Sequence, residues 1–139
     1  MNLYLKNNFF LKTPPKSLDR MIDVFPSDQQ EMIITQLSNC LQAVVSQRLI
    51  ERQDHPGRVM ASEIMKINHG IRACMIERKF EQLIGLIQIG TQEGMHTIDE
   101  SLAHLLINKH ISINDALLHC RDEDYIKENF DSAQTSAKS

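Results

Sequence analysis

The chain has 139 residues, and at roughly 100 to 200 residues per domain this length allows one domain with one core. Hydrophobic residues make up 42% and charged residues 24% of the chain, which excludes a disordered chain and a membrane bundle. The 15 basic and 18 acidic side chains give a net charge of −3, so nucleic acid is not an expected partner. With seven Met and no Trp, the core must consist of Leu, Ile, Val and Met, which suits packed helices.

The amino-terminal stretch, residues 1–15, is predicted to be a divergent lead-in, because Pro14 and Pro15 lack amide hydrogens and favour extended backbone before them. Apolar residues then recur at spacings of three and four from Lys16 to Phe25, which predicts a helix that Pro26 ends. No run approaches the ~20 apolar residues of a membrane helix, and no signal-peptide cleavage site follows the first residues.

A long amphipathic helix is predicted over residues 28–47, where apolar side chains recur on one stripe. The preceding Ser27-Asp28-Gln29-Gln30 has the pattern of a capping box with Ser27 as the N-cap. Two β-compatible runs follow, over residues 48–52 and 58–66, and they flank turn formers at Pro56 and Gly57. These runs predict a β-hairpin.

The rest of the chain is predicted to be helical, with a start signal before most segments. Asparagine, threonine, serine and aspartate favour the first position of a helix because their side chains accept backbone N–H groups, and glycine favours the end. The predicted segments are residues 70–79 after Asn68, residues 80–89 before Gly90, a capping box at Thr97-Ile98-Asp99-Glu100, starts at Ser112 and Asp122, and a flexible polar tail over residues 131–139.

The glycines are too widely scattered to cradle a phosphate. Phosphate-binding loops need closely spaced glycines so that backbone amides can approach the phosphate oxygens. Gly57, Gly70, Gly85, Gly90 and Gly94 match neither G-x-x-x-x-G-K-[ST] nor G-x-G-x-x-G, and none of them precedes Lys. Gly90 and Gly94 are expected to form a helix end followed by a turn.

The other polar residues predict structural roles, so no catalytic residue, metal ligand or cofactor site is assigned in this chain. The histidines of the carboxy-terminal third lie near Cys120 but match no metal-ligand spacing. Cys74 is expected to be a small buried hydrophobe, and Asp99 with Glu100 to serve the start of a helix. Three unpaired cysteines without C-x-x-C favour a reducing, cytoplasmic setting.

An ordered series of matches, from Lys16 to about Leu118, connects this sequence to a known family. The matching segments are Lys16-Ser17-Leu18-Asp19-Arg20-Met21-Ile22-Asp23-Val24-Phe25-Pro26, Gln29-Gln30, Gln36-Leu37-Ser38-Asn39, Val44-Val45-Ser46-Gln47, Gly57-Arg58-Val59, Glu63-Ile64-Met65, Ile87-Gln88, Gly90, and Gly94-Met95 with Thr97, Asp99, Ser101 and Leu102. With them, the chain resembles the carboxy-terminal portion of the PilT-type ATPases, the motors that retract type IV pili in twitching motility, within the secretion ATPase superfamily.

The resemblance implies a fold class that is mainly α with a short β-hairpin, as the C-terminal part of a RecA-like α/β ATPase domain over residues 16–130. In the family, an amino-terminal PAS-like domain precedes the ATPase domain, and six subunits form a ring that uses ATP and Mg²⁺. The family's Walker A loop, acidic box and Walker B carboxylate lie upstream of the matched segment. Phe10 stands where an ungapped match places the family's histidine-box His.

The family also carries an A-I-R-N-L-I-R-E signature that is associated with retraction. The corresponding stretch here is Gly70-Ile71-Arg72-Ala73-Cys74-Met75-Ile76-Glu77. It keeps Ile71, Arg72 and Glu77, whereas Ile76 replaces the second Arg and removes a forked hydrogen-bond donor. The resemblance therefore makes Gly70, Ile71, Arg72 and Glu77 candidate interaction residues, although a solvated helix face explains the charges of this segment equally well.

Three functions are compatible with the resemblance. The first is a truncated PilT-like motor protein that has no nucleotide site of its own. The second is an interaction module that docks on full-length ATPase subunits or on the pilus platform protein of the inner membrane, since the strands over residues 48–52 and 58–66 would have exposed edges. The third is a gene remnant without a role. The expected partners are further copies, homologous subunits and the platform protein, in the cytoplasm or peripheral at the inner membrane.

Overall fold

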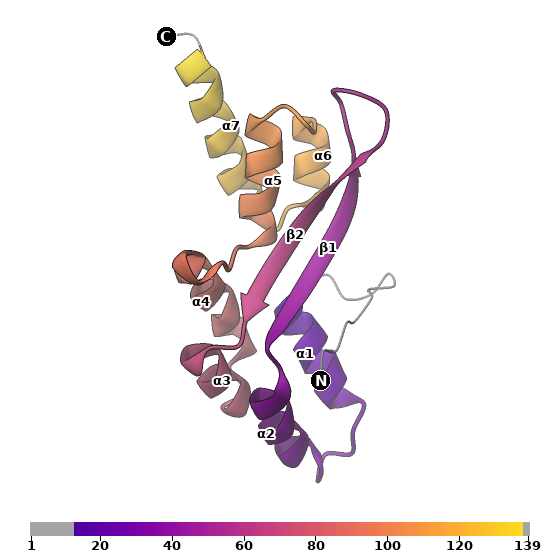
Figure 1. Ribbon diagram of the computed structural model, residues 1–139, viewed down its shortest axis with the longest axis vertical. Helices are drawn as coiled ribbons and strands as arrows, with labels where there is room; N and C mark the ends of the chain where they lie inside the picture. The colour runs from indigo at the N-terminus through magenta and orange to yellow at the C-terminus, as the bar shows by residue number, and fades with distance from the viewer. Residues whose placement is uncertain (1–12, 138–139) are drawn as a thin grey trace. The chain divides into compact units, whose positions relative to one another are not determined.

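The computed structural model describes residues 13–137, and the elements of this part are shown in Figure 1. The predictions for residues 1–12, including the position of Phe10, and for residues 138–139 lie outside the described residues. The α-helices are α1 Pro14–Asp23, α2 Gln30–Cys40, α3 His69–Ile76, α4 Leu83–Ile89, α5 Ile98–Ile107, α6 Ile113–His119 and α7 Glu123–Ala137; the strands are β1 Ala43–Glu51 and β2 Arg58–Lys66; short 3₁₀ helices are η1 Phe80–Gln82 and η2 Thr91–Glu93.

The chain divides into two compact units, so the expectation of a single core is wrong. One unit consists of the described part of Met1–Ser46 with Glu63–His96, and the other of Gln47–Ser62 with the described part of Thr97–Ser139. Each unit has its own cluster of buried apolar side chains, and β1 and β2 contribute to both clusters. The core residues of the first are Leu18, Leu41, Met65, Ile71, Cys74, Met75, Leu83, Ile87 and Met95; those of the second are Ile50, Ala61, Ile98, Leu102, Ala103, Leu105, Leu106, Ile111, Ala116 and Ile126.

Helix α1 begins two residues earlier than predicted, because both prolines belong to it. Pro14 and Pro15 occupy its first positions, where the missing N–H groups would have no partner within the helix. Thr13 is the N-cap, and its side chain accepts a hydrogen bond from the Lys16 backbone N–H. The fixed φ of proline therefore starts this helix, whereas the sequence pattern was interpreted as extended lead-in.

The predicted helix over residues 28–47 is wrong at both ends. Helix α2 starts at Gln30 without a side-chain cap, because the Gln29 N–H is bonded to the Pro26 carbonyl in a turn, so Ser27 is not an N-cap. The helix ends at Cys40, and the residues from Ala43 onward form β1. Two consecutive β-branched valines, Val44 and Val45, favour a strand once a partner strand is available.

The predicted β-hairpin is present, and β1 is longer than expected. The Arg52 N–H donates to the Gly57 carbonyl and the Ile67 N–H to the Gln42 carbonyl, at 3.0 and 2.9 Å. These two bonds, with two strands of nine residues each, fix an antiparallel register that has no bulge and places Leu49 opposite Met60.

Helix α3 starts as predicted and ends early. The Asn68 side chain accepts a hydrogen bond from the Ile71 N–H at 3.0 Å, which confirms the predicted N-cap. The helix stops at Ile76 instead of residue 79, because Arg78 adopts a left-handed backbone with φ 57°. Residues 80–89, predicted as one helix, are divided into η1 and α4.

Gly90, the C-cap of α4, is required by a close contact and not by its backbone angle. Its φ is −86°, but a Cβ atom there would lie 2.1 Å from Met95 Cε, 3.1 Å from Met95 Sδ and 3.1 Å from the Leu86 carbonyl oxygen. Met95 is itself buried in the core and cannot move away freely. Four residues later, Gly94 with φ 83° provides the left-handed turn that follows η2.

We expect Gly90→Ala to lower the free energy of unfolding by about 1–3 kcal/mol, the usual cost of overpacking a core. The matched control is Gly85→Ala, on the same helix, because nothing lies within 4 Å of a Cβ at that position. The control should raise stability by about 0.5–1 kcal/mol, since alanine is the better helix former. Urea denaturation of both variants measures the difference, and equal effects would contradict the predicted contact.

The second unit confirms the predicted capping box. The Glu100 N–H donates to Thr97 Oγ1, and Glu100 Oε2 accepts from the Thr97 N–H at 2.7 Å. Ser112 caps α6 by accepting from the Asp115 N–H, also as predicted. Helices α5, α6 and α7 lie side by side (Figure 1), and α7 continues beyond residue 131, so the flexible tail was predicted too early.

Candidate functional site

The predicted interaction residues lie on α3, where they have different environments. Ile71 is fully buried in the core of the first unit, and Gly70 faces Leu86, whose methyl carbons would lie 3.8 Å from a Cβ at that glycine. Arg72 is half-buried, and its Nε donates to the Ser38 carbonyl of α2 at 2.8 Å. Glu77 is exposed at the end of the helix, where it forms an ion pair of 2.6 Å with Lys79.

Four exposed residues share one side of α3, because they follow one another at spacings of four, three and one. We call this surface the outer face of α3; it consists of His69, Ala73, Ile76 and Glu77. Ile76, which stands in place of the family's second Arg, is 52% exposed. Arg78 beyond the helix end donates to Gln30 Oε1 of α2 at 3.0 Å. Arg72 and Arg78 thus bond this segment to α2, whereas Ile76 and Glu77 are exposed to solvent, with Glu77 in its ion pair with Lys79.

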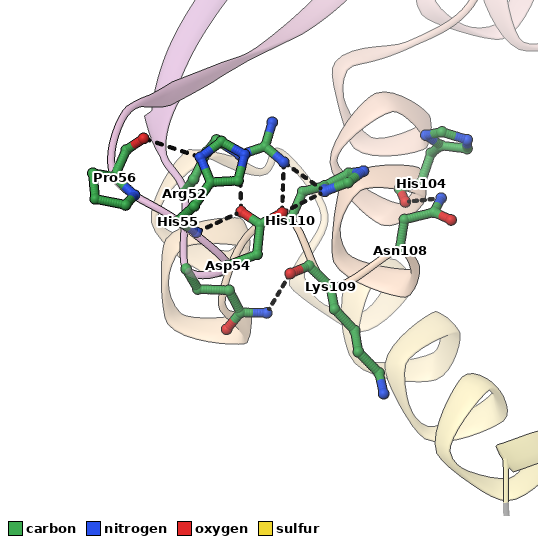
Figure 2. A network of polar contacts seen from close by, with 9 residues as sticks. Arg52, Asp54, His55, Pro56, His104, Asn108, Lys109 and His110 are labelled. Carbon is green, nitrogen blue, oxygen red and sulfur yellow. Dashed lines mark hydrogen bonds and ion pairs between the residues drawn. The ribbon is translucent and has the colours of Figure 1, made fainter.

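The second unit contains a charged cluster that the sequence did not indicate. Figure 2 shows the side chains of Arg52, Asp54 and His110 converging next to the turn of the hairpin. Arg52 Nε and Nη2 donate to the two carboxylate oxygens of Asp54 at 2.8 and 2.5 Å. His110 Nδ1 lies 3.0 Å from both Asp54 Oδ2 and Arg52 Nη2, so it donates to the former or accepts from the latter. We call these three residues the hairpin-turn cluster.

Main-chain bonds reinforce the hairpin-turn cluster. The Gln53 N–H donates to the His110 carbonyl at 2.9 Å, and Gln53 Nε2 donates to the Lys109 carbonyl at 3.0 Å. Lys109 itself adopts φ 61°, the left-handed turn that lets α5 end and the chain reverse. The cluster thus fastens the hairpin turn to the connection between α5 and α6. Its arrangement is structural, because each charged group is occupied by another group of the cluster.

Asp54 should make the acid stability of the protein depend on this cluster. Hydrogen bonds from Arg52, and then from His110, hold the pKa of Asp54 well below its usual range near 3.9. The folded state therefore favours the ionised carboxylate: its stabilisation is present above about pH 4 and is lost as the pH falls further. Asp54→Asn should flatten the fall of the melting temperature between about pH 5 and 3 relative to wild type. Asp131→Asn, at an exposed site on α7, is the control, and an identical acid limb in wild type and Asp54→Asn would contradict the assignment.

The carboxylates and thiols considered for chemistry have structural surroundings. Asp99 accepts the backbone N–H groups of Arg121 and Asp122 at 2.7 and 3.0 Å, ahead of α7. Glu100 completes the capping box, and Cys74 is buried among apolar side chains. Over residues 13–137 there is no group of three or more His, Cys, Asp or Glu that could hold a metal ion. No described helix is long and apolar enough to cross a membrane.

Comparison with known proteins gives close relatives for most of the chain. It is 41% identical over 91 residues to a twitching motility protein of Neisseria gonorrhoeae. The aligned residues make up 66% of this chain and 24% of that protein. It is 40% identical over 115 residues to the type IV pilus retraction ATPase PilT of Pseudomonas aeruginosa, covering 83% of this chain and 32% of that protein. No family model matches the chain.

The fold gives the same result. The crystal structure of a pilus retraction motor PilT with bound ADP matches with a TM-score of 0.71 and 30% sequence identity. The match covers 82% of this chain and 31% of the motor. The mainly helical fold with one hairpin is therefore that of a part of such an ATPase. This chain spans about a quarter to a third of the length of the relatives that it matches.

Proposed function

We propose, from the premise that this chain is a relative of the PilT-type pilus retraction ATPases, that it acts in type IV pilus retraction as a subunit-contacting segment. The observation that carries this proposal is the 40% identity to a retraction ATPase over 83% of the chain. The solved relative is a pilus retraction motor, and a segment of such a motor can take part in it through its contacts with other subunits. We infer that the contacting surface is the outer face of α3.

The geometry of α3 supports this choice. The side of α3 that carries Ile71 is buried in the core, and the Arg72 side chain donates a hydrogen bond to the Ser38 carbonyl. Ile76 and Glu77 remain at the surface, as an apolar and an acidic group side by side on a helix end. Ile76 offers apolar area that a partner can cover, and Glu77 offers a charge for a basic side chain of the partner. The four candidate interaction residues thus divide into three that pack or bond within the first unit, Gly70, Ile71 and Arg72, and one at the surface, Glu77, which we propose meets the partner.

The proposed partner is an ATPase subunit of the same family, either a further copy of this chain or a longer homologue. The platform protein of the inner membrane is the second candidate, which the outer face of α3 would also fit. Both proposals place the chain in the cytoplasm, at the base of a pilus. Substitutions on the outer face of α3 test the first of these partners.

Ile76→Asp and Glu77→Arg should each weaken binding to the PilT of Pseudomonas aeruginosa at least about tenfold, as expected for loss of a contact worth 1.4 kcal/mol. Leu118→Asp on α6 is the matched control, because Leu118 is 77% exposed but lies in the other unit. The affinity is measured by biolayer interferometry with circular dichroism as a check of folding. Loss of binding in the control variant but not in the α3 variants would refute this surface.

We also propose that these 139 residues do not hydrolyse ATP by themselves. Phosphoryl transfer needs amides or a Lys around the phosphates and a carboxylate that holds Mg²⁺. The scattered glycines of this sequence provide no such loop, whereas the solved PilT, of which this chain covers 31%, holds ADP. The test is ATP turnover by the purified chain: we expect the rate of a blank preparation, whereas turnover that persists through further purification would overturn this part of the proposal.

A further inference from the structure

Helix α3 ends with an arginine at a position that favours glycine. Arg78 has φ 57°, and its N–H donates to the Met75 carbonyl at 3.1 Å. The next N–H, of Lys79, donates to the Cys74 carbonyl at 2.9 Å. These two bonds form a Schellman motif, whose left-handed residue is usually glycine because a Cβ atom is unfavourable there. Since arginine is locally unfavourable at this position, its side chain is a candidate for a functional role.

The Arg78 side chain is oriented by two consecutive hydrogen bonds. Arg78 Nη2 donates to Gln30 Oε1 at 3.0 Å, and Gln30 Nε2 donates to the Phe25 carbonyl at 3.0 Å. The Gln30 amide is therefore fixed by the main chain and fixes the direction of the guanidinium. The bond to Gln30 uses one of the five N–H donors of the guanidinium, and Arg78 is exposed. The remaining donors can meet a partner.

The charge of Arg78 is not balanced by a carboxylate in residues 13–137. Gln30, to which it is bonded, is neutral, and none of the ion pairs in this part of the chain involves Arg78. The neighbouring charges are different, because Glu77 and Lys79 pair with each other at 2.6 Å. An oriented guanidinium with unused donors binds a carboxylate well, through two parallel hydrogen bonds. The end of α3 therefore suits an acidic group.

We propose that Arg78 binds a carboxylate side chain of the ATPase subunit that the outer face of α3 contacts. This inference rests on the proposed function and adds the chemical group that the partner presents. Glu77 and Arg78 are adjacent in the chain, so the partner carries a basic and an acidic group side by side. Charged groups at an interface exclude partners that carry the wrong charge. Arg78 is thus a specificity-determining residue, whereas Ile76 supplies apolar area.

Substitutions at Arg78 test this contact by biolayer interferometry with the PilT of Pseudomonas aeruginosa. Arg78→Asn should weaken binding about tenfold, as expected for loss of a hydrogen-bonded charge pair. Arg78→Asp should weaken it severalfold further, because two carboxylates then meet. Asparagine and aspartate tolerate the left-handed backbone, so both variants should keep the wild-type melting temperature within about 3 °C. If Arg78→Asn unfolds the protein by circular dichroism, Arg78→Gly, with the residue that this motif favours, should show the same loss of binding.

Lys109 provides the matched control, because it ends α5 in the same way, with φ 61°, and lies in the other unit. Lys109→Asn and Lys109→Asp change the net charge equally and should leave binding unchanged; an equal loss in these variants would assign the effect to net charge and overturn the inference. If Glu77→Arg weakens binding but Arg78→Asn does not, or if Arg78→Asp binds as tightly as Arg78→Asn, this inference is overturned and the proposed function stands. A folded wild-type chain that does not bind PilT would overturn both.

Discussion

Ile71→Ala should lower the free energy of unfolding by about 2–5 kcal/mol, because it removes a buried side chain and leaves a cavity. Ile71 is 0% exposed and packs in the core of the first unit, between α3 and its neighbours. Urea denaturation followed by circular dichroism measures the loss. The result matters for function, since it would assign one retained residue of the segment from Gly70 to Glu77 to folding.

Ile76→Ala is the matched control for Ile71→Ala, five positions later at the end of the same helix. Ile76 is 52% exposed, so its truncation should cost less than about 1 kcal/mol, as for most surface changes. The two variants should also separate in their binding to a PilT-type ATPase, with Ile76→Ala the weaker binder once both are folded. Equal losses of stability in the two variants would show that α3 does not lie with its Ile71 side in the core.

Asp99→Ala should lower the free energy of unfolding by about 2–4 kcal/mol. Asp99 is 7% exposed, and its carboxylate accepts the backbone N–H groups of Arg121 and Asp122, which precede α7. Hydrogen bonds to a charged group contribute about 1.5–3 kcal/mol, and the alanine variant leaves both donors unpaired. Thermal unfolding monitored by circular dichroism measures the effect.

Asp99→Asn separates the hydrogen bonds of this side chain from its volume. Asparagine keeps one carbonyl oxygen, so it can satisfy one of the two N–H groups and should retain about half of the stability that alanine loses. Asp124→Ala, at an exposed position on the first turn of α7, controls for the loss of a negative charge near the helix start. Equal stability of the alanine and wild-type proteins would rule out the proposed cap.

Sequence patterns correctly predicted the helix caps in which both hydrogen-bond partners lie within one helical turn. The capping box at Thr97 and the caps at Asn68 and Ser112 involve residues three positions apart, so the pattern contains the whole interaction. Pro56 and Gly57 likewise marked the hairpin turn. The prediction of Ser27 as an N-cap is wrong, because residues 26–29 form a turn in which the Gln29 N–H donates to the Pro26 carbonyl.

Long-range contacts could not be read in this way. Val44 and Val45 fit the helical stripe of α2, and only pairing with β2 makes them a strand. The hairpin-turn cluster joins Asp54 to His110 over 56 residues, and Arg72 reaches Ser38 over 34 residues. In each of these bonds the partners are far apart in the sequence and belong to no common pattern, so the sequence does not predict the bond.

The sequence also did not predict which residues of the segment from Gly70 to Glu77 are buried and which are exposed. The resemblance grouped Gly70, Ile71, Arg72 and Glu77 as one interaction site, because motif matching treats all retained residues alike. Helix orientation separates them, with Ile71 in the core and Glu77 at the surface. Ile76, which departs from the family pattern, is a large apolar residue that is 52% exposed.

Equilibrium binding of the purified chain to the PilT of Pseudomonas aeruginosa tests most directly whether this chain contacts a PilT-type ATPase. We expect saturable binding with a dissociation constant in the micromolar range, weakened at least about tenfold by Glu77→Arg. No binding at concentrations up to about 100 µM, by a wild-type chain that is folded by circular dichroism, would contradict the claim.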